Sequence, residues 1–264
     1  MDNLLTAIVL SIVEGLTEFL PVSSSGHLIL AGNLLNFTGA RAATFEVVIQ
    51  LGAILAVVVL YRERFIGLLK PQPHARFAGS RGILLLALTS LPACLLGLSL
   101  HSVIKQYLFR PATVLIALLV GAVCMIFVER RKCRAVCINL DAMTPRLALG
   151  IGCFQCLALW PGFSRSAATI MGGMLLGTGR ALATEYSFIA AVPIMIAATG
   201  YDLLKNFALF SETDIPFFLT GLAGAFVSAL LGIKIFVALV GRMSLMPFAV
   251  YRLLLAPLVY YFTI

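Results

Sequence analysis

Hydrophobic residues fall into long runs that are separated by short polar segments. Six of these runs lie at 44–61, 82–100, 111–129, 184–203, 216–240 and 246–263. A helix of about 20 residues rises about 30 Å, which is the thickness of the hydrocarbon core of a bilayer. The alternating pattern of a membrane β-barrel is absent from the sequence. The pattern therefore predicts six transmembrane helices.

Two further apolar segments, 4–35 and 147–178, are interrupted in the middle by Pro, Gly and Ser. The interruptions read PVSSSGH (21–27) and PGFSRSA (161–167). Neither segment makes one clean span. We expect each to enter the membrane, turn near the midplane and return, as a re-entrant pair of half-helices.

An offset of 140 residues relates the two halves of the chain. It aligns Pro21 with Pro161 and Ser24 with Ser164, and it carries 44–61 and 82–100 onto later spans. Each half then holds one re-entrant pair and three spans, and because three is odd, the halves lie upside down relative to each other. We predict an all-α polytopic membrane protein with an inverted-topology repeat. Its single integral membrane domain, 1–264, comprises repeat A (1–130), a basic cytoplasmic loop (130–146) and repeat B (147–264).

Composition and charge agree with a membrane protein. Hydrophobic residues make up 61% of the chain and charged residues 11%, whereas soluble domains average about 25% charged residues. The formal charge is +8, but the basic residues gather in short loops, as in cytoplasmic loops of membrane proteins, so we expect no nucleic-acid partner. The N-terminus lacks a basic n-region, and we expect no cleavable signal peptide. The six cysteines show no zinc-site spacing and are expected to be reduced.

Two carboxylates precede the first interruption. Glu14 and Glu18 are four residues apart, so their side chains share one helix face. A charge at the centre of a transmembrane helix costs roughly 2.5–3.5 kcal/mol. The carboxylates must therefore be paired, solvated or metal-bound. They can ligate a divalent cation, Mg²⁺ or Ca²⁺, or one can act as a general base. A helix-packing ion pair is the structural alternative.

Serine-rich turns open both returning helices. Helix N-termini favour phosphate through free amides and the helix dipole, and Arg165 adds a planar guanidinium suited to phosphate oxygens. A salt bridge from Arg165 to Glu14 or Glu18 is the alternative, and it is compatible with phosphate binding. The candidate catalytic residues are Glu14, Glu18, Ser24, His27 and Arg165. The candidate phosphate-binding residues are Ser23, Ser25, Gly26, Ser164, Arg165 and Ser166. The candidate metal ligands are Glu14 and Glu18.

This set of residues suits phosphoryl chemistry on a substrate that resides in the membrane. The nucleophile stays open among His27, Ser24 and a metal-activated water. A lipid-phosphate flippase or transporter is the second hypothesis, because inverted repeats with broken helices are typical of transporters. A flippase binds phosphate but needs neither a base nor a nucleophile, so Arg165 opposite two acids and a histidine favours an enzyme.

Three segments resemble the signature segments of the bacterial undecaprenyl-diphosphate phosphatase family, the bacitracin resistance proteins. They are EGLTEFLPVSSSGH (14–27), TFEVVIQLGAILAVVV (44–59) and CFQCLALWPGFSRSAATI (153–170). By this resemblance the family's acidic pair falls on Glu14 and Glu18, its serine turn on 23–25, its histidine on His27, and its phosphate-binding arginine on Arg165. Many members have Thr at position 25 and Gly at position 167.

The resemblance implies a hydrolase that removes one phosphate from undecaprenyl diphosphate, which regenerates the lipid carrier for peptidoglycan precursors. Bacitracin sequesters the diphosphate, so such enzymes confer resistance. The resemblance also implies an inverted-repeat fold, dependence on a divalent metal, and a site open to the periplasmic side of the bacterial inner membrane. The partners expected are the polyprenyl diphosphate and membrane lipid, and the chain acts alone or as a homodimer.

The loop charges predict the membrane topology. The loops 62–81 and 129–146 each hold five basic residues, whereas 201–216 holds three acidic residues against one lysine. Basic loops remain in the cytoplasm, so we expect both basic loops inside, residues 205–215 outside, and both termini periplasmic. The measurement is labelling of single-cysteine variants, in a background without native cysteines, by an impermeant maleimide in intact cells. Labelling of residue 72 from outside contradicts the arrangement.

Overall fold

The computed structural model describes residues 4–70, 77–108, 110–131, 135–205, 214–240 and 243–263. In these ranges the regular elements are helices, and one isolated bridge joins Cys137 to Thr178. The helices long and apolar enough to cross a membrane are α3 (Ala40–Leu60), α5 (Gly79–Ser99), α7 (Pro111–Arg130), α10 (Arg180–Lys205), α11 (Ile215–Val240) and α12 (Met246–Thr263). The six predicted spans are confirmed, and α3 and α10 each begin four residues earlier than the hydrophobic pattern indicated.

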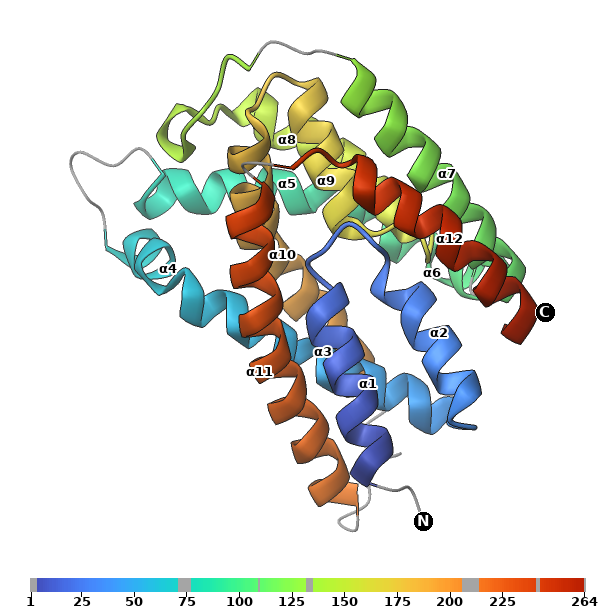
Figure 1. Cartoon of the computed structure of the whole chain (residues 1–264). Coiled ribbons are helices and arrows are strands. Elements are labelled where there is room, and N and C mark those ends of the chain that lie inside the picture. The colour runs from blue at the N-terminus through green and yellow to red at the C-terminus, as the bar shows by residue number, and fades with distance from the viewer. Residues whose placement is uncertain are drawn as a thin grey trace.

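Both interrupted segments are helix–break–helix units. The first comprises α1 (Leu4–Thr17) and α2 (Ser24–Leu34). The second comprises α8 (Pro145–Gln155), a 3₁₀ turn (Cys156–Leu159) and α9 (Arg165–Leu175). The turn after α1 and the turn before α9 lie close together in the middle of the bundle (Figure 1), where the hydroxyl of Ser166 donates to the carbonyl of Leu20 at 2.9 Å.

The two breaks have the same local structure, with an offset of 141 residues. Ser23 and Ser164 are the N-caps of α2 and α9, and they adopt left-handed φ angles of 71° and 77°. Each serine oxygen accepts the amide of the third residue on, Gly26 or Ala167. The alignment of Ser24 with Ser164 was therefore wrong by one residue. In a run of three serines only the cap geometry identifies the equivalent one, and it makes Ser24 the counterpart of Arg165.

Two ion pairs lie at opposite ends of α3. Arg41, near the start of α3, forms an ion pair with Asp214, just before α11. Arg64, just after α3, forms an ion pair with Glu185, near the start of α10, at 3.3 Å. The second pair places the C-terminal end of α3 at the N-terminal end of α10. Since the two helices also pack together, they run antiparallel.

Short elements complete the chain. They are α4 (Arg62–Leu69), α6 (His101–Val103), a π-helix (Ile104–Leu108) and a 3₁₀ turn (Leu140–Ala142). The segment around residue 137 lies against the turn between α9 and α10, where the amide of Val136 and that of Cys137 donate to the carbonyl of Gly177.

The bundle packs tightly inside and presents an apolar surface outside. At Gly15, a Cβ atom would lie 2.6 Å from the backbone carbonyl oxygen of Ala225, so α1 and α11 meet backbone to backbone. On the outside, Leu95, Val227 and Leu254 are at least 60% exposed. A surface of this kind suits lipid as its solvent.

Five of the six cysteines lie in the described residues. The described cysteines, Cys94, Cys124, Cys137, Cys153 and Cys156, are free. Cys133 lies outside the described residues, as do four of the charged loop residues behind the topology prediction: Arg76, Lys132, Arg134 and Glu212.

Candidate active site

A chain of polar contacts joins the two breaks. Glu18 follows α1, and its Oε2 accepts a 2.6 Å hydrogen bond from the hydroxyl of Ser24 at the start of α2. Its Oε1 receives Nη2 of Arg165, the first residue of α9, at 3.4 Å. The carboxylate and the guanidinium are nearly buried, at 7% and 11% exposed. The predicted salt bridge is present, and it uses Glu18.

Arg165 is held on several sides but keeps one free donor. Its Nη1 donates to the carbonyl of Ser187 on α10 at 3.1 Å, and its Cζ lies 5.4 Å from the ring centroid of Phe19. The Ser187 hydroxyl is in turn bonded to that of Thr169 at 2.6 Å. Within the described part of the chain, the buried Nε of Arg165 has no hydrogen-bond partner. It can therefore donate to a bound oxyanion.

Glu14, on α1, lies one helical turn before Glu18 on the same face and is more deeply buried. Its side chain is 1% exposed, and its Oε2 has no hydrogen-bond partner among the described residues. It lies within electrostatic range of Glu18, Glu46 and Arg165. Glu14 therefore lies near two other carboxylates and one arginine, so this region has more acidic than basic groups and can take up a proton or a cation.

His27 is engaged through both ring nitrogens. Its Nδ1 lies 2.7 Å from the carbonyl of Ser23, and its Nε2 lies 2.7 Å from the hydroxyl of Tyr251 on α12. The carbonyl can only accept, so Nδ1 carries the proton and Nε2 accepts from the tyrosine. The structure thus places His27 beside the first break, oriented by α12, and not in contact with Glu18.

The predicted phosphate-binding serines take different roles. Ser23 and Ser164 cap their helices, so the amide of Gly26 is used by the cap. Ser166 bonds to Ser164 at 3.0 Å and holds the two breaks together through Leu20. Beyond each cap, the first two amides of α2 and α9 point out of the helix end, which leaves Ser24, Ser25, Arg165 and Ser166 as the residues with N-terminal amides for an anion.

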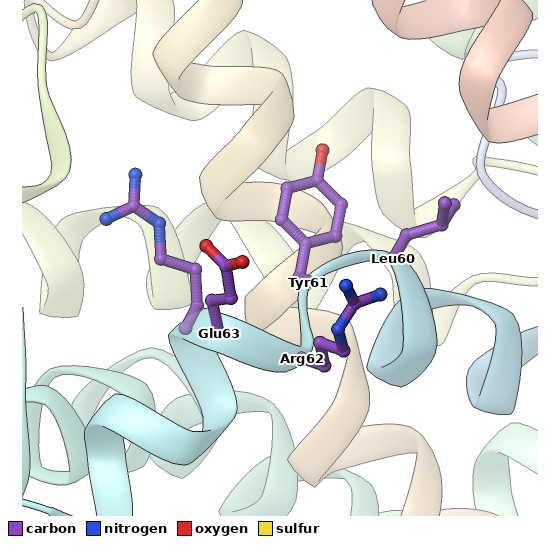
Figure 2. Close-up of a pocket in the computed structure, with 5 residues that line it drawn as sticks. Leu60, Tyr61, Arg62 and Glu63 are labelled. Atoms are coloured by element: carbon purple, nitrogen blue, oxygen red, sulfur yellow. The ribbon is translucent and has the colours of Figure 1, made fainter.

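A separate pocket lies at the junction of α3 and α4 (Figure 2). Leu60, Tyr61, Arg62, Glu63 and Arg64 line it, and none of the candidate site residues is among them. Arg64 is engaged there with Glu185. The titratable groups that can carry chemistry are gathered at the breaks, and we place the site there.

The side chains at the two breaks supply only some of the ligands that a metal ion needs. In the ranges that the structure describes, no group of three His, Cys, Asp or Glu side chains can hold a metal ion. Glu14 nevertheless offers a buried oxygen without a partner. Mg²⁺ is commonly bound by one or two carboxylates together with substrate phosphates. The site therefore fits a cation that the substrate helps to bind.

Sequence reasoning missed four residues around the site. They are Glu46, Ser187, Tyr251 and Arg252. Glu46 and Arg252 are ionisable residues inside apolar spans, and such residues face the protein interior and mark functional sites. The sequence therefore already pointed to Glu46 and Arg252. Ser187 and Tyr251 carry no comparable signal, because hydroxyl side chains are common in membrane helices.

Comparisons with known proteins agree along nearly the whole chain. The family model of the bacitracin resistance protein BacA matches residues 7–258. The undecaprenyl-diphosphatase of Desulfovibrio desulfuricans is 78% identical over 264 residues, covering 100% of both chains. That of Nitratidesulfovibrio vulgaris strain DP4 is 70% identical over 262 residues, 99% of each chain. Undecaprenyl-diphosphatase 1 of Bacillus anthracis is 50% identical over 256 residues, 97% of each.

The two acids should differ in their effect on stability. We expect Glu18→Gln to lower the free energy of unfolding by about 3 kcal/mol, because it leaves the buried guanidinium of Arg165 without its charge partner. Glu14→Gln should leave stability unchanged or raise it, because it removes one of several clustered carboxylates. The measurement is equilibrium unfolding in mixed detergent micelles. Equal losses in the two variants contradict the arrangement of charges described here.

Proposed function

The chain belongs to the BacA family of bacitracin resistance proteins, and we propose that it hydrolyses undecaprenyl diphosphate to undecaprenyl phosphate and inorganic phosphate. The relatives named undecaprenyl-diphosphatase cover the chain from end to end. A multipass membrane protein suits a substrate that resides in the bilayer. Hydrolysis of the diphosphate that bacitracin sequesters accounts for resistance to the antibiotic.

One observation carries the proposal: the contacts that run from Ser24 through Glu18 to Arg165. A hydroxyl, a carboxylate and a guanidinium lie in sequence between two helix N-termini. The carboxylate can accept a proton, the hydroxyl can attack, and the guanidinium with the exposed amides can bind phosphate oxygens.

In the mechanism we propose, Glu18 takes the proton of Ser24, whose Oγ attacks the terminal phosphorus. The new Oγ–P bond replaces the bond to the bridging oxygen, which departs on undecaprenyl phosphate. Water then hydrolyses the phosphoserine, and Ser24 regains its proton as inorganic phosphate is released. Arg165 stabilises the charge on the transferring group through its free Nε. His27, whose ring nitrogens bond to Ser23 and Tyr251, orients the turn.

We also propose a divalent cation, Mg²⁺ or Ca²⁺, as the cofactor. Glu14, and Glu18 when it is released by Arg165, would hold it together with the substrate phosphates. When bound, such a cation neutralises charge on the diphosphate. The unpartnered oxygen of Glu14 supports this assignment.

The proposed topology is an inverted repeat in the bacterial inner membrane, with periplasmic termini and a site open to the periplasm. The antiparallel course of α3 and α10 supports it. So do contacts between segments assigned to the same side: Arg180 and Glu129 form an ion pair where the cytoplasm is expected, and the rings of His101 and Tyr201 meet, 5.7 Å apart, at the periplasmic end.

The flippase reading is the less favoured of the two. The names of the relatives favour an enzyme. In addition, Ser24 bonded to Glu18 supplies a nucleophile with its base, which movement of a lipid does not require.

Arg165→Lys tests the function and the role of the arginine together. We expect wild-type protein to release phosphate from a polyprenyl diphosphate in the presence of Mg²⁺, and the variant to fold but turn over about 10²–10³ times more slowly. Lysine keeps the charge beside Glu18 but loses the planar donor geometry. Turnover and thermal stability are measured on the same preparation. A stable variant with a wild-type rate assigns Arg165 a structural role only, and an inactive wild-type protein refutes the proposed function.

Glu14→Gln tests the cofactor. If Glu14 helps to hold the cation, the variant needs a higher Mg²⁺ concentration for half-maximal turnover, and its maximal rate falls. The measurement is initial rate across a Mg²⁺ titration, with Glu63→Gln, an exposed acid on α4, as the control. An unchanged Mg²⁺ dependence in Glu14→Gln removes Glu14 from the proposed metal site.

A further inference from the structure

Arg252, on α12, is the largest fully buried side chain of the described residues and is 0% exposed. Its Nη1 and Nη2 donate to the carbonyls of Phe163 and Gly162, each at 2.8 Å. Its Nε and Nη2 also donate to the carbonyls of Leu118 and Ala117 on α7, at 3.1 and 3.2 Å. The guanidinium therefore joins α7 and α12 to the second break.

This arginine has no ion-pair partner among the described residues. Its acceptors in this part of the chain are four backbone carbonyls and the sulfur of Met125 at 4.0 Å. A buried charge without a counterion is costly, and an apolar side chain would fill the same space at less cost. The contacts with carbonyls therefore explain why an arginine, and not an apolar residue, occupies this position. Its planar guanidinium presents five N–H groups in fixed directions.

Two of the carbonyls that Arg252 binds, those of Gly162 and Phe163, belong to a strained turn. Gly162 and Ser164 adopt left-handed φ angles of 96° and 77°, which is uncommon for serine. Residues in such conformations cost of order 1–3 kcal/mol and persist only where the surrounding structure holds them. Arg252 binds the carbonyls of Gly162 and Phe163, which belong to the two successive peptide groups on either side of the Phe163 Cα. Trp160 anchors the other end of the turn by donating to the carbonyl of Thr113 at 3.0 Å.

The same turn aims the catalytic arginine. Ser164 caps α9 and Arg165 is its first residue, so the direction of the Arg165 side chain follows from the conformation of the turn. The contact from Arg165 to Glu18 is already long, at 3.4 Å. A small rotation of the turn would break it, and would move the guanidinium away from the phosphate.

α7 has a gap for this side chain at Gly121. A Cβ atom there would lie 2.4 Å from Nη2 of Arg252 and 2.8 Å from its Cζ. The missing side chain lets the guanidinium reach the carbonyls of Ala117 and Leu118 one turn earlier on the same helix. The site for the arginine is therefore formed jointly by α7, α12 and the break.

We propose that Arg252 is a positioning residue for the hydrolysis: it holds the turn at 162–164 so that Arg165 reaches Glu18 and the phosphate. This inference rests on the proposed function. Arg252 touches neither the substrate nor the reacting atoms and acts through Arg165.

The test is the turnover of Arg252→Lys. We expect kcat to fall about 10²-fold, the size of loss that misplacement by about 1 Å produces, and any rise in KM to be no larger than that of Arg165→Lys, because Arg252 itself makes no substrate contact. Arg180→Lys is the matched control. Arg180 also holds helices together, through Glu129 and the carbonyl of Met243, but away from the breaks. It should lose stability without loss of kcat.

Two further variants separate positioning from general stability. Gly121→Ala should displace the guanidinium while favouring the helix, since alanine is the better helix former, and should lower kcat in the same direction. The double variant Arg252→Lys with Arg165→Lys should turn over no more slowly than Arg165→Lys alone, because both changes remove the same interaction. A double variant whose loss is the product of the two single losses overturns the proposal, as does wild-type kcat in both Arg252→Lys and Gly121→Ala.

A readout without turnover keeps the inference separate from the proposed function. If Arg252 holds Arg165 against Glu18, Glu18→Gln should lower the free energy of unfolding by less in the Arg252→Lys background than in the wild-type background. This expectation holds whatever the substrate is. An undiminished loss overturns the positioning role. Absence of phosphate release from wild-type protein, by contrast, refutes only the proposed function.

Discussion

The need to pair buried charge governs this structure. Carboxylates and guanidinium groups within an apolar bundle are costly unless they meet one another or a backbone dipole. Glu18 and Arg165 meet each other, and this contact joins two breaks that are far apart in the chain. Ser24 takes the second oxygen of the carboxylate. The groups that satisfy the charge are also those that suit phosphoryl transfer, so one set of contacts supports both folding and chemistry.

α12 is the element that orients both breaks. Two successive residues face different partners: the hydroxyl of Tyr251 meets His27 at the first break, and Arg252 grips the second. The N-terminus of the helix is tied to α7, because Glu129 accepts the amide of Leu245 at 3.0 Å. Through these contacts, the surrounding helices hold the two turns in place although the backbone of the turns is strained.

The two breaks share a local structure but differ in their charged residues. With the offset of 141 residues, Glu14 corresponds to Gln155, and both side chains are 1% exposed. Gln155 donates its amide to the carbonyl of Thr89 at 3.1 Å, in a neutral network with Tyr186. The acids therefore belong to the first half and the arginine to the second. The candidate site between the two breaks is therefore asymmetric in its charged groups.

The spans and the two breaks followed from the sequence, because hydrophobic length and helix-breaking residues are local signals. Charge within apolar runs is also a local signal, and it selected the candidate residues. The partner of Arg165 did not, since Glu14 and Glu18 share one helix face and only packing decides which is nearer. The sequence also did not show that Ser23 corresponds to Ser164, because that equivalence rests on the helix N-caps. The roles of Tyr251 and Arg252 likewise arise only when α12 packs beside both breaks, because contacts between residues so far apart in the chain exist only in the tertiary structure.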